Sequence, residues 1–152
     1  MKIGIVSKNH YLEYTDVYRG IQFVVLFISG GYRTAYINVK NTRLENVGYM
    51  KCDDYVDVHY GFTYKDNRLP FELECNDSYT WLGWDYAHCS DGYDLSTIEK
   101  YFGQAEYHKM MKSYDFGLFA SLSHSGHVYT LTEVVDECKR AIDEVIRNEN
   151  NN

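Results

Sequence analysis

The stretch YVDVHYGFTY at residues 55–64, together with YTWLGWDY at residues 79–86, carries the pattern that decides the fold. Side chains on a β-strand alternate between two faces, so a half-buried strand shows apolar residues at every second position. The first stretch alternates in this way, and we predict a strand there. One face holds Val56, Val58, Tyr60, Phe62 and Tyr64, and the other holds Asp57, His59, Gly61 and Thr63.

The second stretch alternates in the same way and predicts a strand that pairs with the first. A polar segment, residues 65–78, joins the two strands and contains the only proline, Pro70. An antiparallel pairing that keeps the apolar faces together can shift only in steps of two residues. Leu82, Trp84 and Tyr86 form the apolar face of the second strand, and Trp81, Gly83 and Asp85 form the other.

The predicted pairing places a candidate site on the face opposite the apolar one. One allowed register leaves a hollow between two facing glycines, beside a His/Asp pair and walled by a tryptophan. Glycine inside a strand often marks a bulge or the close approach of a ligand. The alternative is a His/Asp pair that only orients a strand end next to a bulge. The facing pairs of this register are His59–Asp85, Gly61–Gly83 and Thr63–Trp81.

A polar run, DYAHCSD at residues 85–91, follows the second strand. Its spacing lets Asp85, His88 and Asp91 converge where a strand ends in a turn. Histidine and carboxylate groups can ligate zinc or manganese, and they can also form an acid/base pair. Because three-residue spacings of Asp and His are common by chance, no second helix carries a matched pair and only two histidines fall in residues 55–91, we predict no metal and no other cofactor. Plain turn chemistry at Asp91 and Gly92 is the alternative.

Both stretches resemble boxes of a family of small uncharacterised proteins from phages, prophages and bacterial genomes. HYGFTY at residues 59–64 is similar to the family's His-Gly-Gly-Leu/Ile-Thr-Tyr/Phe box. WLGWDYAHCSD at residues 81–91 is similar to its Trp-x-x-Gly-Phe-Asp-Cys-Ala-His-x-x-Asp box, with one residue fewer before the glycine. Residues 33–37 resemble its upstream strand and residues 129–146 its closing helix. The resemblance covers residues 32–146 and implies a phage or mobile-element setting, but no activity.

The chain departs from the family pattern in two further places. Tyr60 stands where the family has the first glycine after its histidine. Residues 40–51 replace the family's Pro-x-Gly-His-Pro-x-Tyr-Gly segment. If that segment contributes to the family's site, the site of this chain differs from it.

Composition limits the classes of function. The 152 residues, 24% charged and 45% hydrophobic, predict a single globular domain over residues 1–152. The net charge of −7 argues against direct nucleic-acid binding, which needs a basic surface. It suits the opposite role, in which an acidic protein occupies a nucleic-acid groove on a basic partner. The 16 tyrosines suit a binding surface or the packing of a small sheet.

Cysteine spacing and hydropathy bear on location. The four cysteines form no Cys-x-x-Cys pair, so we expect no thiolate zinc site. The first residues are too short an apolar run for a signal peptide, and no stretch is long enough to span a membrane. We therefore predict a cytoplasmic protein of a bacterial host cell, with reduced thiols and no membrane contact. A homo-oligomer is compatible with the sequence.

The segments before the first box predict a strand at residues 2–6 and a loop at residues 7–20. The continuous apolar run at residues 21–28 predicts a buried strand. Ser29-Gly30-Gly31 then forms a hairpin turn into a strand at residues 32–39. In that strand Ala35, Ile37 and Val39 face the core, whereas Arg33 is solvated near the turn. Residues 40–54 form a polar connector.

The segments after the second box predict three helices. Residues 96–102 form a short helix with Ser96 as its cap, and residues 104–112 have helical composition. His124 and His127 belong to a glycine-containing turn, with metal ligation as the alternative. Thr130-x-x-Glu133 is a capping box, and an apolar stripe with helical spacing follows up to Ile146, before a frayed tail at residues 148–152. The stripe includes Val134, Val135, Cys138, Ala141, Ile142 and Val145, with Glu133, Asp136, Glu137, Lys139, Arg140, Asp143 and Glu144 on the solvent side.

We therefore predict an α+β fold, with a mainly antiparallel sheet of about five strands and a long C-terminal helix packed on one face. The first functional hypothesis is a phage or mobile-element accessory protein that counters host defence by binding a nucleotide-like ligand or a defence protein. The second is a small hydrolase acting on a phosphoester or nucleotide through His59, Asp85 and His88. The third is an acidic nucleic-acid mimic that inhibits a nuclease. The predicted ligand-binding residues are His59, Thr63, Trp81, Asp85, His88 and Asp91.

Overall fold

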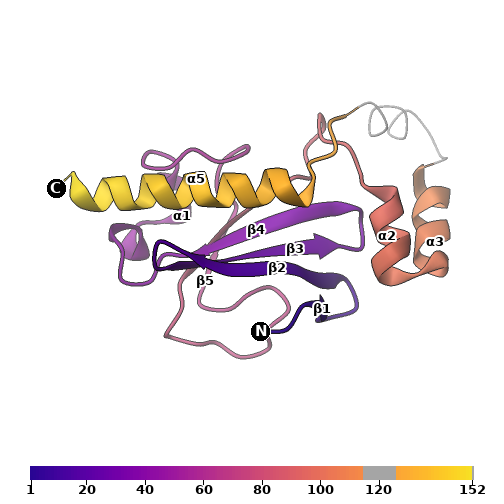
Figure 1. Ribbon diagram of the computed structural model, residues 1–152, viewed down its shortest axis with the longest axis horizontal. Coiled ribbons are helices and arrows are strands. Elements are labelled where there is room, and N and C mark those ends of the chain that lie inside the picture. Colours follow the sequence, from indigo (N-terminus) through magenta and orange to yellow (C-terminus); the bar gives the residue numbers. More distant parts are fainter. Residues whose placement is uncertain (115–125, 152) are drawn as a thin grey trace.

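One antiparallel sheet of six strands, in the order β1-β2-β3-β4-β6-β5, carries helix α5 along one face (Figure 1). The computed structural model describes residues 1–114 and 126–151. It confirms the α+β class and the long C-terminal helix, with one strand more than the predicted five. The strands are β1 (Gly4–Ile5), β2 (His10–Tyr18), β3 (Ile21–Ile28), β4 (Tyr32–Asn38), β5 (Tyr64–Asp66) and β6 (Trp81–Asp85). The described helices are the 3₁₀ helix η1 (Arg43–Asn46), α1 (Tyr49–Cys52), α2 (Leu95–Phe102), α3 (Gln104–Tyr114) and α5 (Leu131–Asn150).

Strand β3 lies at the centre of the fold, and both of its faces are buried. Phe23 and Val25 pack into the core beneath α5, while Val24 and Leu26 pack into a second core on the opposite face. A strand covered on both sides needs a continuous apolar run rather than an alternating one, which explains its sequence. The hairpin with β4 is confirmed, with Val25 opposite Ala35.

Residues 10–18 form strand β2, so the predicted loop at residues 7–20 is wrong. Strand β2 pairs with β3 along its whole length, and a short turn at Arg19 and Gly20 joins the two strands. Only Leu12 and Glu13 of this strand are buried, and they are adjacent, so the strand shows no apolar alternation. Glu13 is the extra residue of a β-bulge, because Leu12 pairs with Leu26 and Tyr14 pairs with Val25.

Helix α5 closes the first core and begins where the sequence predicts. Thr130 and Glu133 form both hydrogen bonds of the capping box. The helix packs on β2, β3 and β4, and its buried stripe includes Cys138 and Ile142. It continues to Asn150, so residues 148–150 of the predicted frayed tail are helical. Along the described residues, no helix combines the length and apolar character that crossing a bilayer requires.

Arg33 is buried, so its predicted solvation is wrong. Its guanidinium donates to both carboxylate oxygens of Glu13, at 2.6 and 2.9 Å, and to Asp94 at 3.2 Å. It also donates to the backbone oxygen of Tyr129, just before α5. The bulge in β2 turns Glu13 toward Arg33, and the hydroxyl of Tyr101 adds a further bond to Glu13. This ionic network joins β2, β4, α2 and the start of α5.

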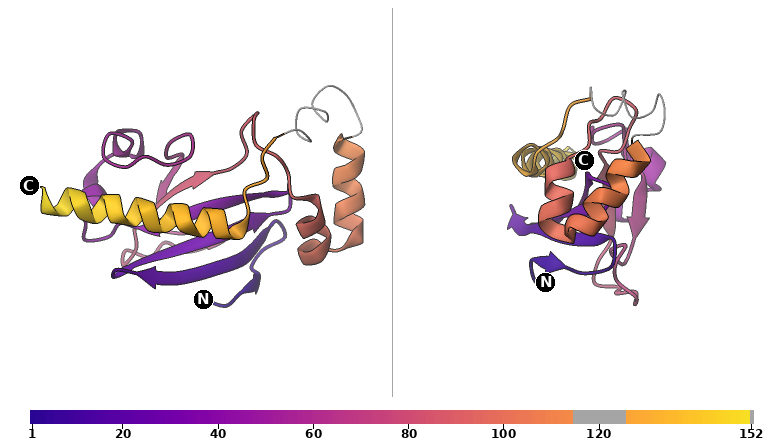
Figure 2. Two further views of the ribbon diagram at one scale, coloured as in Figure 1. Left: turned by 45° about the horizontal axis from the view of Figure 1, so that its top comes forward. Right: turned by 90° about the vertical axis from the view of Figure 1, so that its right-hand side faces the viewer.

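Helices α2 and α3 lie beyond one end of the strands, as Figure 1 and the left view of Figure 2 show. The predicted helix at residues 104–112 is confirmed within α3. The cap of α2 is Asp94 rather than Ser96, because the Asp94 carboxylate accepts the backbone N–H of Thr97. The same carboxylate pairs with Arg33, which fixes where the helix starts.

The packing of α5 predicts the effect of Ile142→Ala. Ile142 is fully buried, so the change should lower the free energy of unfolding by about 2–5 kcal/mol through lost burial and a cavity. Val135 is only partly buried, and Val135→Ala should cost less. Asp136→Ala, on the exposed side of the same helix, is the control and should leave the melting curve nearly unchanged. Equal melting curves for Ile142→Ala and this control would show that α5 does not dock.

The buried ionic network predicts a second effect on stability. Arg33→Met leaves the Glu13 carboxylate buried without its counter-charge and should cost about 3–5 kcal/mol in urea unfolding. Arg19→Met removes a surface ion pair with Asp143 and should have little effect. A similar midpoint for both variants would contradict the role assigned to Arg33.

Candidate functional site

Residues 55–63 form turns rather than the predicted strand. Tyr60 and Gly61 have positive φ angles of 57° and 83°, which an extended strand does not allow. A side-chain atom on Gly61 would lie 2.8 Å from the Asp53 carboxylate, which accepts the N–H of Phe62. The alternating apolar residues Val56, Val58 and Phe62 are buried as predicted, but they reach the core from turns.

The register of β5 and β6 also differs from the prediction. Tyr64 lies opposite Gly83, so the predicted Gly61–Gly83 and His59–Asp85 pairs do not form. An odd shift in register exchanges the two faces of a strand. The ring of Tyr36 fills the space over Gly83, where an added Cβ would lie 2.5 Å from a ring carbon. The predicted hollow between facing glycines is therefore absent.

Trp81 is a core residue, and its predicted role as an open wall is wrong. Its side chain is only 1% exposed and stacks on Tyr79, with ring centroids 5.3 Å apart. It packs with Tyr36 and Leu69 on the face away from α5. The segment after β5 runs beneath this face in Figure 1 and covers it. The alternating pattern separated the two faces of β6 correctly, but the face with Trp81 is buried as well as the face with Leu82 and Trp84.

Three of the predicted site residues do converge, in a group that we call the His–Asp–His cluster: His59, Asp91 and His88. Nε2 of His59 lies 2.9 Å from each carboxylate oxygen of Asp91. Nδ1 of His88 lies 3.1 Å from Oδ2 of Asp91, which also accepts the backbone N–H of His88 at 2.9 Å. Asp91 is 2% exposed. A buried carboxylate thus holds two imidazoles that come from segments about 30 residues apart in sequence.

The position of Asp91 depends on close backbone packing near the start of α5. Asp91 forms a parallel bridge with His127, and the N–H of Gly92 donates to the carbonyl of His127 at 2.7 Å. A Cβ on Gly92 would lie 2.4 Å from the carbonyl oxygen of Gly126, so this approach requires glycine. Of the predicted turn with two histidines, His124 lies outside the described residues. The exposed His127 ring pairs with Glu133.

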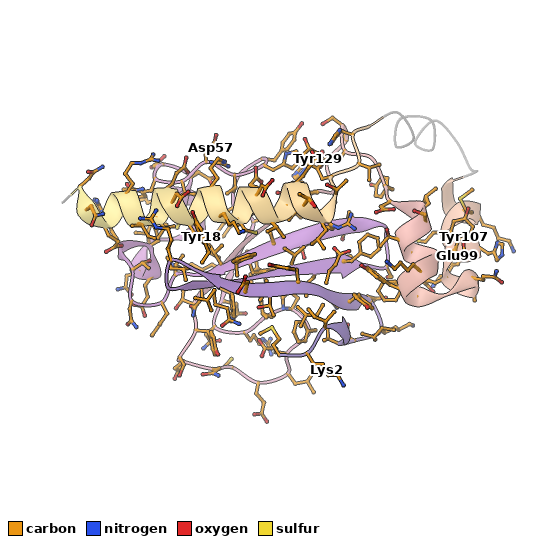
Figure 3. The ribbon with its side chains drawn as sticks, in the orientation of Figure 1. Lys2, Tyr18, Asp57, Glu99, Tyr107 and Tyr129 are labelled. Carbon is orange, nitrogen blue, oxygen red and sulfur yellow. The ribbon has the colours of Figure 1, made fainter. Side chains whose placement is uncertain are left out.

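Aromatic rings surround His59. Its ring stacks on Tyr86 at 4.7 Å and contacts Tyr60 at 4.8 Å and Tyr129 at 4.6 Å. Figure 3 shows Tyr129 at the start of α5. Burial, and then the charge of Asp91, raise the pKa of Tyr129. Tyr86 belongs to the second box, and Tyr129 precedes the capping box, but neither position by itself indicated a site.

Glu137 supports this arrangement from α5, where the sequence had placed it on the solvent side. Its carboxylate accepts the backbone N–H of His59 at 3.1 Å and the hydroxyl of Tyr86 at 2.6 Å. The indole N–H of Trp84 donates to the same hydroxyl. Burial and the bond to Glu137 raise the pKa of Tyr86, which therefore stays a neutral donor. The helix thus fixes the backbone that carries His59.

Tyr60 covers the other histidine. Its ring stacks on His88 with centroids 4.1 Å apart, and its hydroxyl is hydrogen-bonded to Ser90 at 2.8 Å. The side chain is 62% exposed, so it forms an outer edge of the cluster.

Asp85 and Thr63 lie beside the cluster rather than within it. Oδ1 of Asp85 is 3.8 Å from Nε2 of His88, and the hydroxyl of Thr63 donates to Oδ2 of Asp85 at 3.2 Å. Both residues line a concave space of about 270 Å³, which we call the tyrosine hollow. Its other lining residues include Tyr32, Thr34, Tyr36 and Tyr64.

The tyrosines of this hollow are neutral at physiological pH. Burial raises the pKa of Tyr64 to about 12 and also raises the pKa of Tyr36. Burial and the nearby Asp85 carboxylate raise the pKa of Tyr32. The hollow therefore offers aromatic faces and phenol groups next to one carboxylate, and its lining among the described residues includes no lysine or arginine.

Comparison with known proteins adds no relative to this description: no protein-family model, no curated protein and no solved structure matches the chain significantly.

Because Trp81 is buried in the core and not part of an open binding surface, removing its side chain should lower stability. Trp81→Ala should destabilise the protein by about 3–5 kcal/mol, as should Trp84→Ala, because both indoles are in the core. Leu73, 91% exposed in the segment that covers Trp81, provides the control Leu73→Ala. If Trp81→Ala melts like wild type, the covering segment does not pack as described.

Proposed function

We propose that this protein is a small hydrolase acting on a phosphoester or nucleotide, with the His–Asp–His cluster activating water. The observation that carries the proposal is the buried carboxylate of Asp91, which holds His59 and His88 together. A buried acid that orients an imidazole is the arrangement from which catalytic acid–base groups are commonly built. The proposal keeps His59 and His88 from the sequence hypothesis and replaces Asp85 with Asp91 as the central acid.

His88 is the group that transfers the proton. Its side chain is 25% exposed, against 13% for His59, so substrate and water reach it more easily. When Nδ1–H donates to Asp91, Nε2 is the basic nitrogen, and a buried carboxylate that orients an imidazole in this way is a recurring catalytic device. The imidazolium formed after proton transfer lies between Asp91 and Asp85.

His59 is a positioning residue. Its Nε2 lies equally close to both oxygens of Asp91, and its ring is held between Tyr86 and Tyr129. It therefore fixes the carboxylate that orients His88.

During hydrolysis the oxygen of water bonds to phosphorus while its proton passes to Nε2 of His88. The bond from phosphorus to the leaving oxygen then breaks, and that oxygen takes the proton back.

The tyrosine hollow is the candidate substrate-binding site, because it shares Asp85 with the surroundings of His88. Aromatic rings can stack on a nucleobase, and neutral phenols can donate hydrogen bonds to its edge or to phosphate oxygens. Its volume is near the lower limit of small-molecule sites, which favours a mononucleotide-sized group over a polymer.

A second candidate function is favoured by the same hollow: the protein binds a nucleotide-like ligand without converting it. In the setting that the family resemblance implies, a phage or mobile-element accessory protein of this kind would counter a host defence by sequestering the ligand. Binding by this route no longer involves Trp81, because its ring is buried. Turnover distinguishes the two candidates.

An activity assay with matched variants tests the proposal. Purified protein is incubated with bis(p-nitrophenyl) phosphate and with a panel of mononucleotides and cyclic nucleotides, and products are separated by chromatography. His88→Ala should lower turnover by about 10²–10⁴-fold, the usual contribution of general acid–base catalysis. His108→Ala, an exposed histidine on α3, should retain full turnover and is the control. Circular dichroism checks that both variants fold.

Two outcomes contradict the hydrolase. Stoichiometric nucleotide binding in calorimetry without any product would favour the binding protein instead. Turnover that is equal in wild type and in His88→Ala would show that the activity does not come from this cluster.

A further inference from the structure

We propose that His59, His88 and Asp91 bind one divalent transition-metal ion, with zinc as the preferred ion and manganese as the next. The sequence predicted no metal, because three-residue spacings of Asp and His are common by chance and no second helix carries a matched pair. The fold brings His59 onto Asp91 rather than Asp85 and so completes a set of three side chains. The metal site rests on geometry; only its use on an anionic substrate rests on the proposed function.

The three side chains offer donor atoms at distances that suit one ion. One atom from each residue can be chosen so that all three lie within 4.8 Å of one another. Nitrogen and oxygen ligands bind zinc at about 2.0–2.2 Å, which sets donors around one ion about 3–4 Å apart. The distances from Asp91 to His59, 2.9 Å, and to His88, 3.1 Å, are already close to this range. Small side-chain rotations complete the geometry.

The surroundings of His88 fit a metal ligand. A histidine that ligates a metal through one ring nitrogen usually donates its other N–H to a carboxylate or carbonyl group. Here Nδ1 faces Asp91, and Nε2 points toward the carboxylate of Asp85 at 3.8 Å, which is an ion-pair distance rather than a hydrogen bond. A ligand role for Nδ1 would leave the outer N–H beside this carboxylate.

The charge balance of the site also favours a cation. The ion pairs that Asp85 and Asp91 make within the described residues are with His59 and His88. The described residues that line the tyrosine hollow include no lysine or arginine. Arg140, on the nearby helix, bonds instead to Glu137, Glu144 and the backbone of Asp57. Two carboxylates that pair only with histidines would repel a phosphate when those histidines are neutral, and a divalent ion removes this repulsion.

Hydrogen bonds and ring stacking hold the ligands, and His88 is the most exposed of the three at 25%. The backbone N–H of His59 is fixed by Glu137, and the ring of His88 is held under Tyr60. Three protein ligands leave at least one position for water, which distinguishes catalytic zinc sites from structural ones with four. An ion here would lower the pKa of that water and polarise a phosphoryl oxygen, and it would take over from His88 the activation of water.

Calorimetric titration of chelator-treated protein with zinc tests the inference. We expect one equivalent bound, with at least a 100-fold loss of affinity in His59→Ala and His88→Ala. Asp85→Asn should weaken binding about 10-fold, as loss of an outer hydrogen-bond partner does. The control is His108→Ala. Because Cys89 is exposed next to His88, Cys89→Ser is also required and should keep full affinity.

Cobalt provides a readout that does not depend on the folding of variants. Wild-type protein loaded with Co²⁺ should show visible absorption typical of four- or five-coordinate nitrogen and oxygen ligands, without a thiolate charge-transfer band. Absence of zinc binding to wild type, or equal binding in the double variant His59→Ala/His88→Ala, overturns the inference. So does loss of binding in Cys89→Ser alone.

The metal inference and the hydrolase proposal can fail separately. Zinc binding without turnover of any substrate supports the metal site and contradicts the hydrolase. Turnover by chelated protein that binds no zinc contradicts the metal site and leaves acid–base catalysis by His88 in place.

Discussion

The need to cover both faces of β3 governs the structure. Five successive residues of this strand, Phe23 to Phe27, are fully buried, so apolar side chains project from both sides of the sheet. Exposing either face would forgo about 1.5–3 kcal/mol for each large apolar side chain. Helix α5 covers one face, and the segment between β5 and β6 covers the other. This second cover places Trp81 in the core and determines the register in which β5 meets β6.

The candidate site forms where the turn after β6 meets the start of α5. Strand β6 leaves the sheet at Asp85, and the following turn must pass the start of α5. Gly92 and Gly126 let the backbone after β6 pack directly against the backbone before α5, and this contact holds Asp91 in place. From the opposite direction, Glu137 on α5 fixes the backbone of His59. The cluster is therefore assembled by the helix–sheet contact, and its rigidity derives from the core.

The sequence pattern predicted the elements that depend on residues close together in the chain. The capping box at Thr130 and the apolar stripe of α5 depend on neighbours three and four residues away, so the sequence reveals them directly. The hairpin of β3 and β4 is likewise set by a short glycine turn. Strand β2 was missed because its conformation comes from pairing with β3, and its bulge at Glu13 serves an ion pair with Arg33, 20 residues away.

The sequence by itself determined the α+β class, the C-terminal helix, and the presence of His59, His88 and Asp91 in two short boxes. It could not determine which carboxylate meets His59. Alternation favoured Asp85, because it assumes an extended strand, whereas the positive φ angles at Tyr60 and Gly61 turn the chain away. Only the tertiary structure selected Asp91, because that choice depends on how closely the turn after β6 approaches the start of α5. Contacts between segments far apart in the chain leave no repeating pattern in the sequence, so a search for local patterns does not reveal them.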